Sequence, residues 1–210
     1  MKKIFLLLLA IAALFWLLSP QTHTMTLAAT SLSTPASAIP LVNISPHSGH
    51  DMLEVRIPDA DMDYYDVSGN SAMEIRDALK HRHTHGGFDG YTSWHVSWNW
   101  PGLGQHNCDL DSAELQTSIR VRLPRWHVPR NADPALILKW NSYLGSLAHH
   151  EQGHVQLARQ GFAKMQQILQ RSTCDEAHAK LNVVLDEMRQ ADLRYDAETR
   201  HGHTQGAKFP

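Results

Sequence analysis

The sequence contains only two cysteines, Cys108 and Cys174, and neither belongs to a C-x-x-C pair. This absence argues against a zinc site built from thiolates, because such sites space their cysteines closely. No cluster of basic residues occurs, and the formal net charge is −2, so nucleic acid is not expected as a partner. The chain also has no internal repeats, which excludes a repeat architecture.

A single long apolar run, from Ile4 to Leu18, follows the basic start Met1-Lys2-Lys3. Fifteen residues match the core of a signal peptide and are short for a membrane span. No strong cleavage site follows, so an uncleaved segment that tethers the protein to a membrane through residues 4–18 stays open. We expect residues 1–38 to be a signal peptide or anchor plus a leader, and residues 39–210 to be one exported domain, periplasmic or secreted.

The two cysteines are expected to be joined if the domain is exported. In an oxidising compartment an isolated pair most often forms a disulfide. The bond would tie the region of the predicted strands to the region after the main predicted helix. The alternative is that the two thiolates bind a metal, which the lack of close spacing disfavours.

Alternation of apolar and polar residues predicts short strands. Apolar residues fall on one face in residues 91–100 and again in residues 117–124, which predicts an antiparallel sheet with one polar face. Two more strands are expected over residues 52–57 and 63–67, and a helix over residues 71–80. The predicted fold class is α+β, with a small antiparallel sheet packed on long helices.

Two long helices are predicted in the second half of the chain. The first begins at Asp133-Pro134, a capping residue followed by a proline that suits the first turn. Its apolar residues recur at steps of three and four: Ile137, Trp140, Leu144, Leu147, Val155, Ala158, Phe162, Met165 and Leu169. After a break near Ser172 the second helix runs to the region of Tyr195, with an apolar side formed by Leu181, Val184, Leu185, Met188 and Leu193.

The first of these helices carries the sequence His150-Glu151-Gln152-Gly153-His154, an H-E-x-x-H motif. Residues four apart lie on the same face of a helix, so His150 and His154 can bind one metal ion together. Glu151 neighbours the first ligand, where a carboxylate can act as a general base on water. It also falls in the phase of the apolar stripe, and a buried carboxylate requires compensation of the kind a metal site gives.

A catalytic zinc ion usually has three protein ligands and a water, so a third ligand is needed. Candidates in the C-terminal tail are Asp196, Glu198, His201 and His203. The loop with His81, His83 and His85 also offers imidazoles, and its spacing suits either a flexible metal scavenger or a solvated turn.

Several motifs together resemble a bacterial family of predicted secreted zinc-dependent proteases, which are zincin-like. They are Tyr64-Tyr65-Asp66-Val67-x-Gly69, Trp94-x-Val96-x-Trp98, Cys108, Leu123-Pro124-Arg125-Trp126, His149-His150-Glu151-x-Gly153-His154, Cys174 and Tyr195-Asp196-x-x-Thr199-x-His201-Gly202. The resemblance covers roughly residues 41–210, and its tail motif makes His201 the preferred third ligand. Asp196 is the alternative, or it orients a ligand histidine. Tyr195 either hydrogen-bonds an oxyanion or packs on the helix pair.

These features predict an exported zinc hydrolase, a metallopeptidase acting on a peptide or protein substrate with Glu151 as general base. The sequence leaves two alternative functions open. One is a non-catalytic periplasmic zinc-binding protein that uses the histidine-rich loop as an accessory site. The other is a zinc amidase that acts on a cell-wall component.

Overall fold

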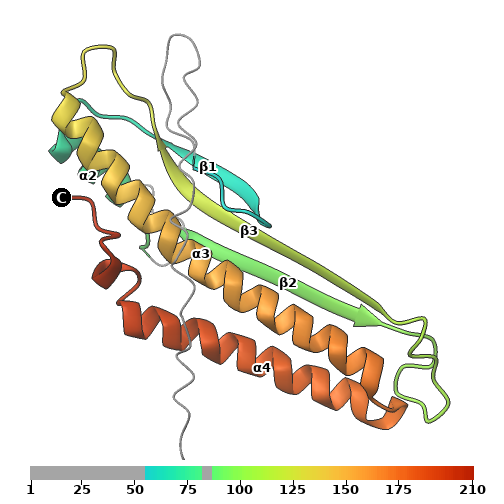
Figure 1. Ribbon diagram of the computed structural model, residues 1–210. Coiled ribbons are helices and arrows are strands. Elements are labelled where there is room, and N and C mark those ends of the chain that lie inside the picture. The colour runs from blue at the N-terminus through green and yellow to red at the C-terminus, as the bar shows by residue number, and fades with distance from the viewer. Residues whose placement is uncertain (1–54, 82–86) are drawn as a thin grey trace, which may run out of the picture. The chain divides into compact units, whose positions relative to one another are not determined.

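The computed structural model describes residues 55–81 and 87–210. The elements in chain order are β1 (Asp61–Val67), α2 (Ala72–His81), β2 (Tyr91–Asn99), β3 (Glu114–Trp126), α3 (Pro134–Arg171), α4 (Cys174–Thr199) and the short 3-10 helix η1 (His203–Gln205). Long helices beside a small sheet confirm the α+β class (Figure 1). The apolar N-terminal run and the predicted boundary at residue 38 lie outside the described residues. The strand predicted over residues 52–57 is irregular where it is described, at residues 55–57.

The sheet has the strand order β1-β3-β2 and is mixed. β2 pairs with β3 antiparallel, with Trp94 opposite Ile119, which confirms the predicted pairing. β1 pairs with β3 in parallel, with Val67 opposite Trp126, so the expectation of a purely antiparallel sheet was wrong. The cause is topological: β2 starts opposite Arg122, beside the first half of β1, and runs antiparallel to β1, and β3 then turns back and lies between them. Alternating hydrophobicity reports which residues face the core and carries no information on strand direction.

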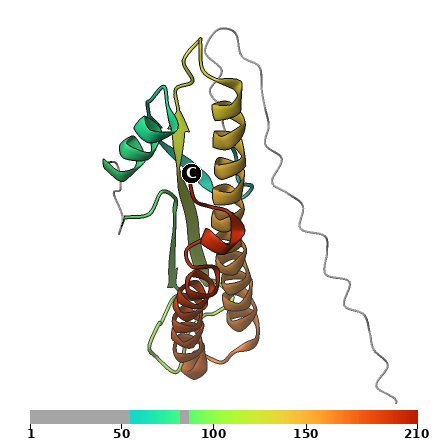
Figure 2. The ribbon, with the colours of Figure 1, turned by 90° about the vertical axis from the view of Figure 1, so that its left-hand side faces the viewer.

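Helix α3 lies along the sheet (Figures 1 and 2) and supplies more buried core residues than any other element that the structure describes. It begins as predicted, because the Asp133 side chain accepts a hydrogen bond from the backbone N–H of Ala135 and Pro134 opens the first turn. The predicted apolar stripe faces inward, with Ile137 and Phe162 half-buried and the other seven members buried. Trp140 is fully buried near the start of α3, where it packs against Trp126, Tyr143 and Phe209.

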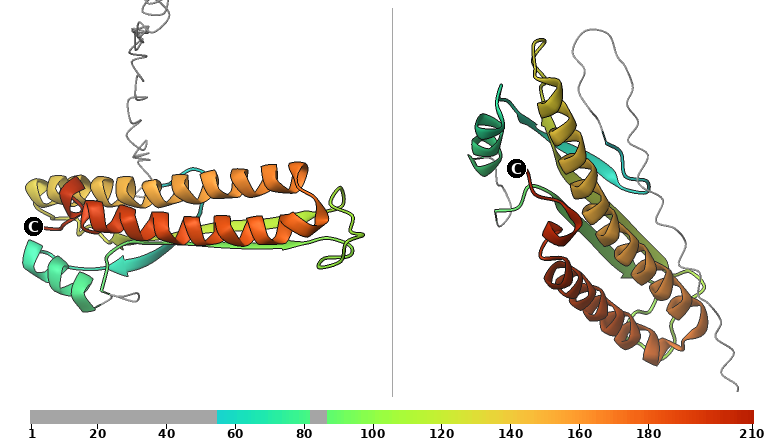
Figure 3. Two further views of the ribbon diagram at one scale, coloured as in Figure 1. Left: turned by 90° about the horizontal axis from the view of Figure 1, so that it is seen from below. Right: turned by 60° about the vertical axis from the view of Figure 1, so that its left-hand side comes forward.

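Helix α4 runs beside α3, as two views show (Figures 1 and 3). Its predicted apolar residues Leu181, Val184 and Met188 are buried, and Leu185 is half-buried. Leu193 was expected on the same side, but it is 62% exposed. At this level of α4 the side towards α3 is occupied by polar residues, described below, and Leu193 is turned to a cavity. None of the helices that the structure describes is long and apolar enough to cross a bilayer.

A disulfide joins Cys108, in the connection between β2 and β3, to Cys174 at the first residue of α4. The predicted pairing is thus confirmed, and the alternative of two metal-binding thiolates is excluded. The bond connects the far end of the sheet to the start of α4, and it is consistent with an exported protein.

Replacing both cysteines by serine is expected to destabilise the fold. The bond closes a loop with a sequence separation of 66, and the loss of this constraint on the unfolded chain costs about 4 kcal/mol in the chain-entropy model. Urea unfolding of the oxidised parent and the double variant should show a clearly lower midpoint for the variant. Equal midpoints would mean that the bond adds no stability.

Candidate metal centre

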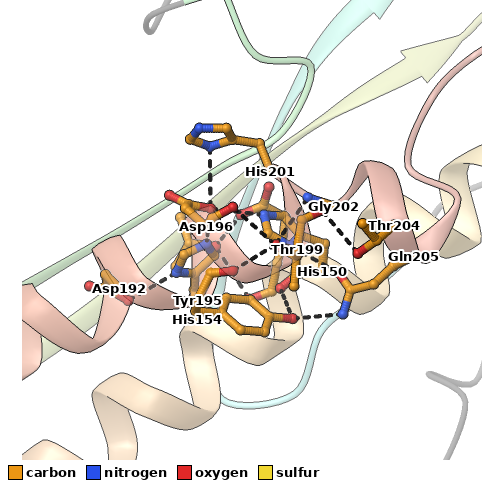
Figure 4. Close-up of polar contacts among 12 residues, drawn as sticks. His150, His154, Asp192, Tyr195, Asp196, Thr199, His201, Gly202, Thr204 and Gln205 are labelled. Atoms are coloured by element: carbon orange, nitrogen blue, oxygen red, sulfur yellow. Dashed lines mark hydrogen bonds and ion pairs between the residues drawn. The ribbon is translucent and has the colours of Figure 1, made fainter.

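Two helices each contribute a pair of polar residues four positions apart, and the two pairs face each other (Figure 4). His150 and His154 come from the middle of α3, and Asp192 and Asp196 come from the last turns of α4. Residues at this spacing share a helix face. The antiparallel packing of α3 and α4 therefore brings two imidazoles against two carboxylates.

The inner part of this cluster converges on a single oxygen atom. The Nε2 atom of His150 lies 3.2 Å from Oδ1 of Asp196, and the Nε2 atom of His154 lies 3.1 Å from the same oxygen. Among the described residues, these three form a group whose donor atoms all lie within 4.8 Å of one another, and both histidines are buried. This His-His-Asp group could hold a metal ion.

The outer nitrogen atoms of both imidazoles face acceptors. Nδ1 of His154 lies 2.9 Å from Oδ1 of Asp192, whose other oxygen accepts a hydrogen bond of 2.7 Å from the indole N–H of Trp94. Nδ1 of His150 lies 3.1 Å from Oε1 of Gln205, and the Gln205 amide donates to the hydroxyl of Tyr195. These contacts fix both rings, as the outer partners of metal-binding histidines commonly do.

Both ring nitrogen atoms of each imidazole face an acceptor. A neutral imidazole carries only one N–H, so it can donate either through Nδ1, to Asp192 or Gln205, or through Nε2, to Asp196. When the N–H lies on Nδ1, Nε2 directs a lone pair at the carboxylate oxygen of Asp196, which is an unfavourable contact. A cation between the three donor atoms makes this arrangement favourable.

The pKa values of His154 and Asp196 reflect their contact with each other. Burial acts to lower the pKa of His154, but its hydrogen bonds with Asp192 and Asp196 outweigh this and raise it to about 9. Burial acts to raise the pKa of Asp196, yet hydrogen bonds from His150 and His154 hold it well below the usual range for a carboxyl. The His154 imidazole and the Asp196 carboxylate therefore stabilise each other's charged forms.

Glu151 lies beside this group without belonging to it. Its side chain is only 3% exposed, and its Oε2 accepts a hydrogen bond of 2.6 Å from the hydroxyl of Thr92 in β2. Burial raises the pKa of Glu151. A Cβ atom at Gly90 would lie 2.5 Å from Oε1, so the chain can approach this carboxylate closely only because a glycine precedes β2. The predicted burial of Glu151 is confirmed.

Glu151 and the His-His-Asp group open onto one cavity of about 770 Å³. Its walls come from α2, the start of β2, the middle of α3, the end of α4 and the C-terminal tail. Leu193, Trp94 and Phe88 give it apolar surface. A molecule in the cavity can therefore reach both the carboxylate and the two imidazoles.

The structure places His201, preferred from the sequence as third ligand, outside the three-residue group. Its ring stacks on Phe88 at a centroid distance of 4.2 Å, and its Nδ1 lies 3.4 Å from Oδ1 of Asp196. The side chain is 46% exposed and lines the cavity, as His203 does. The geometry thus favours Asp196, the alternative that the sequence left open. His81 is exposed at the end of α2, and His83 and His85 lie outside the described residues.

Tyr195 packs between the two helices. Its hydroxyl donates to the backbone carbonyl of His150 at 3.3 Å and accepts from Gln205, and its ring stacks on the His150 ring. It is not among the residues that line the cavity. This is the packing position considered for it from the sequence, and contact with an oxyanion stays a prediction that the geometry does not favour.

Gly153 makes the close approach of Tyr195 possible, and its replacement is expected to disturb the site. A Cβ atom there would lie 2.1 Å from the Tyr195 hydroxyl, and such overpacking costs about 1–3 kcal/mol. Gly145 is the matched control on α3, because a Cβ there meets nothing within 4 Å. We expect Gly153→Ala to lower the thermal midpoint and Gly145→Ala to raise it slightly. Equal midpoints in the two variants would contradict the packing described.

Sequence reasoning missed the outer residues Asp192, Gln205 and Thr92. Asp192 had one available signal, its four-residue spacing from Asp196, which repeats the spacing of the two histidines. Gln205 and Thr92 had none, because their positions depend on how the tail and β2 pack on α3.

Comparison with known proteins gives one match. The model of a family described as "Bacterial protein of unknown function (DUF922)" matches residues 62–202. No curated protein and no solved structure matches the chain. The matched region runs from the second residue of β1 to just beyond α4 and includes the His-His-Asp group, and it is more than half of the sequence. This chain therefore belongs to that bacterial family of unknown function.

Proposed function

We propose that this protein is an exported zinc-dependent hydrolase, and that His150, His154 and Asp196 hold the ion. The observation that carries the proposal is the convergence of two buried Nε2 atoms on one carboxylate oxygen at 3.1–3.2 Å. Ligand atoms of a tetrahedral zinc ion, each about 2.0–2.1 Å from the metal, stand about 3.3 Å apart. Both His–Asp196 distances match this value, and all three donor atoms lie within 4.8 Å of one another.

The donor chemistry also supports zinc. Two imidazoles and one carboxylate are a common ligand set for catalytic zinc, in which further coordination is left to water or substrate. Calcium and magnesium prefer all-oxygen sites, so the two imidazoles disfavour them. The carboxylate and amide behind the two rings hold Nε2 of each ring ready for a metal.

Zinc bound there would supply Lewis acidity that polarises a carbonyl and makes water more acidic. Glu151 would accept the proton of the attacking water and deliver it to the leaving amine. Its position fits this role, because its carboxylate reaches the cavity beside the ligands and the Thr92 hydroxyl fixes its orientation at 2.6 Å. Burial keeps its surroundings poor in competing water.

A peptide or protein is the proposed substrate, which makes the enzyme a metallopeptidase. A cavity of about 770 Å³ with polar and apolar walls accommodates a short peptide segment. The buried Glu151 favours catalysis over the alternative of a metal-binding module, since such a module has no need of a costly buried carboxylate beside its ligands. We also propose export through the segment at residues 4–18, either cleaved or kept as a tether.

The direct test is digestion of a peptide library by the zinc-loaded exported protein, with products identified by mass spectrometry. Cleavage that disappears on chelation and returns with zinc supports the proposal. A parallel incubation with purified cell-wall fragments separates the peptidase from an amidase of the wall. Zinc binding without hydrolysis of either material would mean that the protein is a non-catalytic zinc-binding protein.

A further inference from the structure

Four basic side chains line the cavity of the candidate metal centre. Arg76 and Lys80 come from α2, Arg189 from α4 and Lys208 from the C-terminal tail. α2 and α4 lie apart in two different views (Figures 1 and 3), so these basic side chains come from separate elements of the cavity wall. The proposed metal ion would add further positive charge between them.

The acidic side chains of the same cavity are already engaged. Glu151 accepts a hydrogen bond from Thr92, and Asp192 and Asp196 contact the two imidazoles. Asp89 interacts with Tyr143. Within the described residues, Glu151, Asp192 and Asp196 form no ion pair with the four basic groups.

The four basic side chains, in contrast, form only weak ion pairs or none among the described residues. Lys80 and Arg189 each contact an aspartate one turn away on their own helix, at 3.8 Å and 3.0 Å, and all four side chains in these pairs are more than half exposed. Exposed pairs of this kind contribute little and exchange readily with other anions. Arg76 and Lys208 make no side-chain ion pair or hydrogen bond within residues 55–81 and 87–210.

The spacing along α4 suits an extended chain. Arg189 precedes Asp196 by seven residues, which is about 10 Å along a helix, and the exposed Leu193 lies between them on the cavity wall. An extended peptide covers this distance in about three residues. A substrate whose scissile bond lies at the metal could therefore place one carboxylate near Arg189 and an apolar side chain on Leu193.

We infer that the cavity selects peptides that carry carboxylate groups on both sides of the bond at the metal: those on one side meet Arg189, and those on the other meet Arg76, Lys80 and Lys208. The position of the scissile bond at the metal rests on the proposed hydrolase function. The preference for acidic peptides rests on the four basic side chains of the cavity. Linear acidic peptides and the acidic stem peptides of the cell wall share this chemistry.

The test is equilibrium binding to the full-length Glu151→Gln variant, with and without zinc, measured by fluorescence anisotropy. The probes are a labelled peptide with Asp and Glu on both sides of a central apolar pair, and the same peptide with Asn and Gln. A labelled wall stem peptide and its amidated form make a second pair. We expect the acidic member of at least one pair to bind about tenfold more tightly, because each exposed contact contributes about two- to fivefold. The preference should shrink as salt is raised.

The variants Arg76→Gln and Arg189→Gln should each reduce the acidic preference by about two- to fivefold. Arg194→Gln is the matched control, since Arg194 is exposed on α4 and is not among the residues lining the cavity. Equal binding of acidic and amidated probes in both pairs, or an equal loss in Arg194→Gln, overturns the inference. If the preference is found but no parent preparation cleaves any peptide, the selectivity stands and the proposed hydrolase function fails.

Discussion

Replacing Glu151 by glutamine is expected to abolish hydrolysis and leave zinc bound. The amide has nearly the shape of the carboxylate and its oxygen can still accept the Thr92 hydroxyl, so the buried position stays filled. It cannot accept a proton from water, and the loss of a positioned general base costs about 10²- to 10⁴-fold in rate. The measurements are kcat on a cleaved peptide and zinc content per chain, made on the same preparation.

Two further variants give this experiment its controls. Glu198→Gln makes the same change at an exposed position on α4 outside the cavity, and it should retain full activity. Thr92→Val removes the hydrogen bond that orients Glu151, and it should lower kcat without lowering zinc content. If Glu151→Gln keeps the parent rate, the base is another group and the mechanism proposed here is wrong.

Alanine at His150, His154 or Asp196 is expected to lower zinc affinity by more than 100-fold. Loss of an outer partner of a metal-binding histidine typically costs about 10- to 100-fold, and loss of a ligand costs more. Asp192→Ala should fall in that lower range, because Asp192 holds the His154 ring through Nδ1 at 2.9 Å. His201→Ala should have a smaller effect, since the His201 side chain is 46% exposed, stacks on Phe88 and lies farther from the same Asp196 oxygen, at 3.4 Å.

Competition with a chromogenic chelator measures these affinities. Unfolding curves of the metal-free variants show whether any loss reflects the site or the fold. If His201→Ala loses zinc as completely as His154→Ala while Asp196→Ala keeps it, the third ligand is the imidazole preferred from the sequence.

Much of the fold follows from periodicity. The three- and four-residue steps along α3 and the alternation along β2 and β3 identify the buried faces, because these patterns record which side chains meet the core. The direction of β1 does not follow, since it depends on β3 inserting between β1 and β2. Leu193 shows a second limit of prediction from periodicity. Its apolar side chain continues the spacing of the buried residues of α4, yet it is exposed. At this level of α4, the residues that face α3 are Asp192 and Asp196 of the candidate metal site.

The residues of the candidate site also fall into those that the sequence identifies and those that it does not. His150, Glu151 and His154 could be identified from sequence because one helix fixes their relation. The third donor comes from another helix, so the choice between Asp196 and His201 depends on how α4 ends. Arg200, His201 and Gly202 all have positive φ values of 51° to 76°, which turn the tail back over α3. A Cβ at Gly202 would lie 2.9 Å from Cγ of His150, so only glycine allows this close passage and the contact of Gln205 with His150.

The central claim is that one metal ion lies between α3 and α4. The most direct measurement is a crystal structure of the zinc-loaded protein with anomalous diffraction recorded at the zinc edge. We expect one strong peak, bonded to Nε2 of His150, Nε2 of His154 and a carboxylate oxygen of Asp196, with Glu151 beside it and not coordinating. A zinc-loaded crystal with no peak between these side chains, or a peak bonded to other residues, would contradict the account.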